Sequence, residues 1–168
     1  FILVSWLLLT AGIVLGAWWA YMELGWGGYW AWDPVENASL LPWLAATAAL
    51  HILAVENRSG KLGRASAGLM ALTVIMAFFA TYLTRRGGIQ SVHAFGDGGV
   101  GTPLSVFVLA ALAVTGWALR CAGPQGRPLA SPESREGALV LVAWIFLALA
   151  AIILAATMWP VLSKLWSS

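Results

Sequence analysis

Five long apolar runs constrain this 168-residue chain more than any other feature. They cover residues 1–22, 38–55, 65–84, 102–119 and 137–163, and His51 is the only histidine or charged residue in them. A membrane-crossing helix needs about 20 mostly apolar residues. Because lipid offers no partner to an unpaired backbone group, each run is expected to be helical. The sequence therefore predicts an all-α integral membrane protein, a single region of five transmembrane helices.

The composition supports the same class. The chain is 61% hydrophobic and 10% charged, whereas a soluble domain carries about 25% charged residues. This excludes a soluble enzyme, a disordered tail and a nucleic-acid-binding module, and it makes lipid an expected contact. The one cysteine, Cys121, leaves no disulfide framework. Because the chain begins at Phe1 inside an apolar run, we expect a piece of a longer protein and no signal peptide.

The basic residues in the loops predict an orientation. Segments 57–64 and 120–136 each carry three lysines or arginines, whereas segment 23–37 carries none. Cytoplasmic loops are enriched in these residues. We therefore expect segments 57–64 and 120–136 in the cytoplasm, with loops 23–37 and 85–101 and the C-terminus on the outer face. Arg85 and Arg86 run against this trend and call for a specific explanation.

The segment between the first two runs is unusually rich in aromatic residues. It reads ELGWGGYWAWDPVEN and holds Trp26, Tyr29, Trp30 and Trp32, a cluster broken by Gly27 and Gly28. Tryptophan favours the membrane interface, so an aromatic belt is one interpretation. The density of flat rings favours a stacking platform for a large planar ligand instead. We expect this loop, residues 23–37, to lie along the outer membrane surface.

Two carboxylates end this aromatic segment, and they have two interpretations. Asp33, Pro34 and Glu36 fit the start of a helix, with Asp33 as the N-cap and Glu36 completing a capping box. The alternative is proton transfer or ligand binding by the carboxylates. Capping is the simpler account. Pro42 is expected to interrupt this short helix, so that the membrane helix proper begins there.

The first run carries small residues at a spacing of four, namely Gly12, Gly16 and Ala20. Such a face allows another helix to approach closely. In a chain rich in glycine and alanine the same spacing also arises by chance.

The two histidines of the chain are candidate metal ligands. His51 lies inside the second run, where an ionisable residue indicates a functional site. The neighbouring residues Ala45–Ala49 are small and could leave room for a bulky group bound to an imidazole, which is a good iron ligand. A hydrogen bond to a neighbouring helix is the alternative. His93 lies in the glycine-rich loop, where an exposed loop residue is the alternative to a ligand.

Arg85 and Arg86 begin the loop that carries His93. Beside a haem-binding histidine they could pair with propionates, since arginine binds carboxylates bidentately. The alternative is contact with lipid phosphates. Propionate pairing would account for two basic residues on the outer face.

Four stretches together resemble one family. They are WGGYWAWDPVENASLLPWL (26–44), AALH (48–51), LTRRGGIQSVHAF (83–95) and SREGALVL (134–141). The first resembles the tryptophan-rich WWD signature of haem-handling proteins of cytochrome c maturation, and the other three resemble its CcmF and NrfE members. The resemblance covers essentially the whole chain. Two residues depart from the family pattern. Tyr29 stands where the family commonly has tryptophan, and Arg86 is followed by glycine.

This resemblance implies a function. CcmF-like proteins are membrane components of the cytochrome c haem lyase in the bacterial inner membrane, with the WWD loop on the periplasmic side. They receive haem from the chaperone CcmE, work with CcmH-type and CcmI-type partners, and serve apocytochrome c. The thioether bonds form with cysteines of the apocytochrome, so no catalytic residue is assigned here.

The resemblance also implies the ligands. His51 would ligate a haem b inside the membrane, and His93 would ligate the substrate haem at the outer face. The aromatic loop, with Trp26, Tyr29, Trp30, Trp32 and Asp33, would hold that haem together with Arg85. Each iron would take its second histidine from a part of the protein beyond this chain.

Two other classes compete with this interpretation. A haem exporter or handover protein of the CcmC type has the aromatic signature but no buried histidine pair, so His51 favours the lyase. A quinol-linked electron-transfer subunit or a structural scaffold is the third class, and the density of tryptophan in the loop argues against a scaffold.

Overall fold

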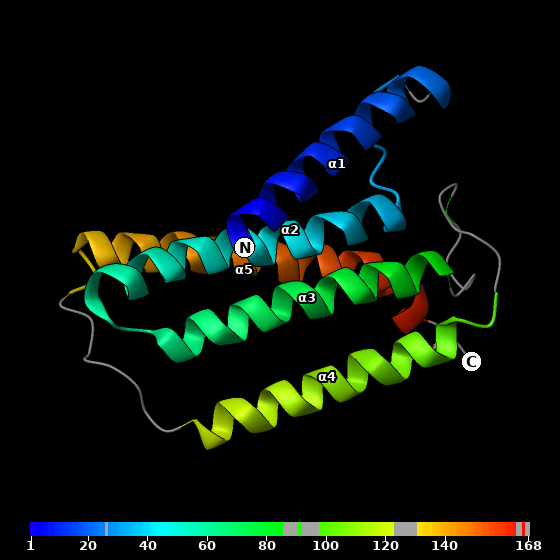
Figure 1. The fold of residues 1–168 in the computed structure, drawn as a ribbon. Coiled ribbons are helices and arrows are strands. Elements are labelled where there is room, and N and C mark those ends of the chain that lie inside the picture. The colour runs from blue at the N-terminus through cyan, green and yellow to red at the C-terminus, as the bar shows by residue number, and fades with distance from the viewer. Residues whose placement is uncertain (26, 86–90, 92–97, 123–130, 164–165, 167–168) are drawn as a thin grey trace.

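The computed structural model describes residues 1–25, 27–85, 91, 98–122, 131–163 and 166. These residues form five α-helices and no strand (Figure 1). The helices are α1 (Ile2–Glu23), α2 (Pro34–Ser59), α3 (Gly63–Arg85), α4 (Gly101–Cys121) and α5 (Arg135–Leu162). Each is long and apolar enough to cross a membrane. The predicted all-α class with five membrane helices is confirmed.

Helix α2 lies at the centre of the bundle. It packs against α1, α3 and α5, and α4 packs on α3 (Figure 1). In its most apolar 18-residue stretch, 61% of α2 is buried, whereas the corresponding share is 17% or less in the other helices. The helices around α2 therefore expose most of their apolar surface, as lipid-facing helices do.

The alanines of α2 explain how its neighbours approach so closely. Ala45, Ala46, Ala48 and Ala49 are all at most 1% exposed. A methyl side chain lets helix backbones come together. Ala48 belongs to a buried cluster with Ile52 of α2 and Ala143 of α5. These alanines are thus covered by neighbouring parts of the protein. The room that their small side chains were expected to leave for a bulky group bound to His51 is therefore not found next to them.

The N-terminus of α2 confirms one prediction and corrects another. Asp33 and Glu36 form the predicted capping box, and Pro34 is the first helical residue. However, α2 begins at Pro34 rather than at residue 38, and it continues through Pro42 to Ser59. The expected interruption at Pro42 is wrong. A proline inside a helix lacks an amide hydrogen and its ring crowds the carbonyl four residues earlier, but Pro42 is buried in the packing that holds this helix together.

Five helix ends gather at one end of the bundle (Figure 1). They are the C-termini of α1, α3 and α5 and the N-termini of α2 and α4. This end also brings the aromatic segment close to Ser91, which follows α3 in the sequence.

The opposite end of the bundle accounts for the SREGALVL stretch. Ser134 caps α5 by accepting a hydrogen bond from the Gly137 amide, and Glu136 forms a 2.9 Å ion pair with Lys61. A Cβ atom on Gly137 would collide with the carbonyl of Pro132. This motif therefore serves the packing of α5 on the α2–α3 turn.

The small residues of α1 do not receive a close helix in this structure. A Cβ atom built on Gly12 or Gly16 meets nothing within 4 Å. Both glycines instead line a cavity of about 700 Å³ between α1, α2 and α3. Of the three predicted positions only Ala20 is buried. Among the described helices, the spacing of Gly12 and Gly16 therefore marks no close helix contact, which favours the alternative that it arose by chance.

Candidate functional site

The aromatic segment is held by the side chain of Asn37, in the first turn of α2. Its amide nitrogen donates to the Trp32 carbonyl at 3.0 Å, and its oxygen accepts from the Trp30 indole at 3.3 Å. Trp32 has a φ of 58°, a left-handed conformation that is uncommon for a residue with a large side chain. Asn37 is only 6% exposed. One buried amide thus stabilises a strained turn and places two tryptophans.

The rings of this segment are open at the surface. Trp32 is 67% exposed and Tyr29 is 58% exposed, whereas Trp30 is half-buried. Tyr29 stacks on Tyr21 of α1, with ring centroids 4.5 Å apart and planes at 19°. The predicted residue Trp26 lies outside the described residues. The described rings offer flat faces to a partner, as a stacking platform requires.

Asp33 joins this segment to the segment that follows α3. Its Oδ1 atom accepts from the amides of Val35 and Glu36 at 2.9 and 3.4 Å, which completes the cap. The same oxygen accepts from the Ser91 hydroxyl at 2.7 Å. Ser91 is two residues from His93 in the sequence. Capping is therefore one function of Asp33, and contact with the histidine-bearing segment is another.

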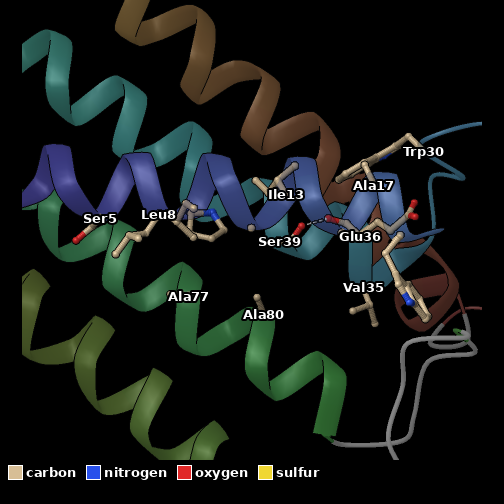
Figure 2. Close-up of a pocket in the computed structure, with 15 residues that line it drawn as sticks. Ser5, Leu8, Ile13, Ala17, Trp30, Val35, Glu36, Ser39, Ala77 and Ala80 are labelled. Carbon is tan, nitrogen blue, oxygen red and sulfur yellow. Dashed lines mark hydrogen bonds between the residues drawn. The ribbon is translucent and has the colours of Figure 1, made fainter. Parts of the chain in front are cut away.

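The cavity between α1, α2 and α3 opens beneath the aromatic segment (Figure 2). Trp30, Val35 and Glu36 line the end of the cavity that is nearest to the aromatic segment, and Ala77 and Ala80 line its α3 side. Ser39, also in its wall, donates to the Glu36 carbonyl at 2.7 Å. Glu36 uses its carboxylate to accept from the amides of Ala31 and Asp33, at 2.9 and 3.3 Å. The carboxylate at the mouth of the cavity thus serves the fold of the aromatic segment.

His51 is half-buried in the middle of the bundle, and its ring is fixed at one nitrogen. Nδ1 lies 2.7 Å from the carbonyl oxygen of Thr47. The ring also lies beside Phe146 of α5, with centroids 5.9 Å apart. A carbonyl oxygen can only accept, so in the neutral imidazole this contact assigns the proton to Nδ1 and leaves the lone pair on Nε2. Among the described residues Nε2 has no hydrogen-bond partner. The donor atom that an iron ligand needs is thus available.

The remaining candidates divide between described and undescribed positions. Arg85 is the last residue of α3 and is exposed at the same end of the bundle as the aromatic segment. Arg86 and His93 lie outside the described residues. Within the described part, no group of three or more metal-ligating side chains occurs.

Comparison with known proteins places the chain. A family model described as "Cytochrome C assembly protein" matches residues 1–90. The chain belongs to this cytochrome c assembly family. No solved structure gives a match.

The relatives are cytochrome c biogenesis proteins. A probable cytochrome c-type biogenesis protein NrfE of Escherichia coli is 46% identical over 94% of this chain and 29% of its own length. The biogenesis protein ccl1 of Rhodobacter capsulatus is 43% identical over 98% of the chain and 26% of its own length. CcmF of Haemophilus influenzae is 38% identical over 96% and 26%. The chain spans between a quarter and three tenths of these relatives.

Two pairs of residues were missed by the sequence analysis. Trp6 and Thr10 on α1 face Trp43 and Thr47 on α2, and they form interhelical hydrogen bonds. The sequence carried a signal for them, since WLLLT and WLAAT repeat the same Trp-to-Thr spacing in consecutive runs. Asn37 and Ser91 were also missed, and their roles depend on contacts that no local pattern encodes.

Proposed function

We propose that this chain is the haem-binding core of a CcmF-type component of the cytochrome c haem lyase in a bacterial inner membrane. The observation that supports it best is the 2.7 Å hydrogen bond from Ser91 to Asp33. It joins the segment that leads to His93 to the segment with the exposed aromatic rings. This contact supports the proposal that the candidate iron ligand and the candidate ring platform form one site, in a chain of the cytochrome c assembly family.

At the outer face, the substrate is haem. His93 would bind its iron, and the rings of Tyr29, Trp30 and Trp32 would contact the porphyrin face. Arg85 would pair with a propionate, because arginine binds carboxylates through two parallel hydrogen bonds. We propose that the haem comes from the chaperone CcmE and that CcmH-type and CcmI-type proteins present the apocytochrome.

The attachment reaction adds a cysteine thiol across each haem vinyl group. A carbon–sulfur bond forms, the thiol hydrogen ends on the neighbouring vinyl carbon, and no atom leaves. Cys121 is the only cysteine of the chain, and it ends α4 at the opposite end of the bundle from the aromatic segment. The thiols therefore come from the apocytochrome, and the contribution of this chain is to hold and orient the haem.

In the membrane, His51 fits a haem b ligand, because Thr47 fixes Nδ1 and leaves Nε2 available. When bound, a haem b supplies a one-electron redox centre to the complex. The two histidines of the chain serve two different sites in this proposal. The second axial ligand of each iron would come from the rest of the longer protein.

Maturation of a c-type cytochrome tests the outer site. In the full-length protein, His93→Ala should abolish haem-stained holocytochrome c at a normal level of the protein, because this chain has no other histidine on that face. Added imidazole should partly rescue His93→Gly, since it can occupy the vacated ligand position. A normal holocytochrome yield from His93→Ala would refute the assignment of His93.

Labelling in whole spheroplasts tests the orientation. In a Cys121→Ser background, a membrane-impermeant maleimide should label Val100→Cys and should not label Asn57→Cys. Both positions are exposed, and they lie at opposite ends of the bundle. The reverse labelling pattern would place the aromatic segment in the cytoplasm and would contradict the proposal.

A further inference from the structure

We propose that Thr47 is the positioning residue of the His51 site: its carbonyl sets which ring nitrogen is free, and its hydroxyl ties that turn of α2 to α1. The inference rests on the proposed role of His51 as a haem ligand. It concerns how the chain itself prepares that ligand.

A reciprocal pair of hydrogen bonds joins α1 and α2. The Trp6 indole donates to the Thr47 hydroxyl at 2.9 Å, and the Trp43 indole donates to the Thr10 hydroxyl at 2.8 Å. Each threonine hydroxyl donates in turn to the carbonyl of the tryptophan four residues earlier in its own helix, at 2.7 Å for Thr47 and 2.8 Å for Thr10. The Trp6 and Trp43 rings stack, with centroids 6.0 Å apart.

This arrangement satisfies groups that lipid cannot. An indole N–H in the membrane has no water to bind, and an unsatisfied polar group there is costly. Thr47 is only 6% exposed, and its hydroxyl both accepts from Trp6 and donates to Trp43. The position of α1 on α2 is therefore specified at this turn, which an apolar contact alone would leave free to slide or rotate.

The same residue fixes His51. The Thr47 carbonyl holds Nδ1 at 2.7 Å, one helical turn before the histidine. Phe146 flanks the imidazole, and Trp43 meets Phe146 edge-on, with centroids 6.2 Å apart and planes at 80°. Trp43 is itself held by Thr10. The imidazole of His51 is thus held at Nδ1 by the Thr47 carbonyl and flanked by Phe146, and Nε2 remains as the ligating atom.

The protonation pattern of the ring gives a test that needs no haem. In the full-length protein without haem, labelled with ¹⁵N-histidine, nitrogen NMR should show the proton of His51 on Nδ1 and a bare Nε2. Subtraction of the His51→Ala spectrum identifies the resonances. A proton on Nε2 would overturn the inference, whether or not the protein binds haem b.

Substitution of Thr47 tests its hydroxyl. Thr47→Val keeps the size of the side chain but removes the acceptor for Trp6. Groups that orient a metal ligand typically contribute about 10- to 100-fold in affinity. Because the carbonyl remains, we expect a loss of haem b affinity near the lower end of that range and a shift in midpoint potential. Thr47→Ser, which keeps the hydroxyl, should restore both values.

Thr73→Val is the matched control. Thr73 on α3 is also 6% exposed, and its hydroxyl also bonds back to a carbonyl four residues earlier, that of Leu69 at 2.9 Å. The Thr73→Val change should leave the midpoint potential of haem b unchanged. Trp6→Phe removes the indole donor while keeping an aromatic ring beside Trp43, and it should reproduce the Thr47→Val shift if that variant folds poorly. Equal effects of Thr47→Val and Thr73→Val, or no shift with either Thr47→Val or Trp6→Phe, would contradict the inference. Absence of any His51-dependent haem b in the parent would instead refute the proposed function.

Discussion

The aromatic segment and the middle of α2 position their candidate binding side chains in different ways. In the aromatic segment, the described tryptophans are placed by a loop with a strained turn, one buried amide and a capping box. In the middle of α2, the alanines exclude space and the hydroxyl–indole bonds fix the neighbouring helix. The loop spreads its role over several exposed rings, whereas the helix concentrates its role in one imidazole. Single changes of one ring in the aromatic segment should therefore be tolerated, whereas loss of either histidine should not.

The largest effect should come from filling space in α2. Ala48 is 0% exposed in the cluster with Ile52 and Ala143, so Ala48→Leu has no room. Overpacking typically costs about 1–3 kcal/mol. Ala110→Leu makes the same change on the exposed surface of α4 and is the control. Thermal unfolding of the purified protein should show destabilisation by the first change only. A similar melting temperature for both would mean that α2 is less tightly packed than described.

The next largest effect should come from loss of the hydrogen bond between Ser91 and Asp33. Ser91→Ala removes a hydrogen bond to a carboxylate, and because the bond is only part-buried we expect a loss of about 1.5 kcal/mol, the lower end of the range for such bonds. We therefore expect reduced holocytochrome c yield at a normal protein level.

Substitutions of Asp33 test whether its hydrogen bonds or its negative charge matter. An N-cap is worth about 1 kcal/mol, and asparagine and serine also cap well. Asp33→Asn should keep the cap and an acceptor for Ser91, so it should be milder than Asp33→Ala in the same maturation assay. If Asp33→Asn abolishes maturation while Asp33→Ala does no more, the negative charge itself is required, and the account from hydrogen bonding is wrong.

The smallest effects should come from single rings. Trp30→Phe keeps an aromatic face but loses the hydrogen bond to Asn37, which is worth about 0.5–1.5 kcal/mol. Trp32→Phe loses no bond from its ring within the described part of the chain, because Asn37 binds the Trp32 backbone. Holocytochrome yield should fall modestly for Trp30→Phe and less for Trp32→Phe. Complete loss with either change would show that the rings do not share the role.

Local patterns in the sequence predicted the helices and one cap, and contacts between distant segments escaped them. The apolar runs define membrane helices because length and composition suffice. Asp33 and Glu36 were recognised as a capping box because the motif is three residues apart. Pro42 was misjudged because burial, which preserves the helix there, depends on neighbouring helices. For the same reason Gly12 and Gly16 could not be assigned to a cavity, and the Ser91–Asp33 bond, which spans 58 positions, could not be foreseen.

The tryptophan–threonine pairs show an intermediate case. Their spacing is visible in the sequence, since it repeats in α1 and α2. Their meaning is not, because a threonine four residues after a tryptophan gains an interhelical partner only when the two helices cross at that turn. A repeated polar spacing in consecutive membrane helices is therefore a signal worth testing in other chains.

The most direct test of the account is the reduced absorption spectrum of the full-length protein with and without His51. We expect the parent to show a low-spin b-type haem and His51→Ala to lose it while the protein still inserts at a normal level. His93→Ala should keep this signal, because the two histidines serve separate sites. A normal b-type spectrum from His51→Ala would contradict the central claim and would favour a haem exporter without a membrane-buried haem ligand in this chain.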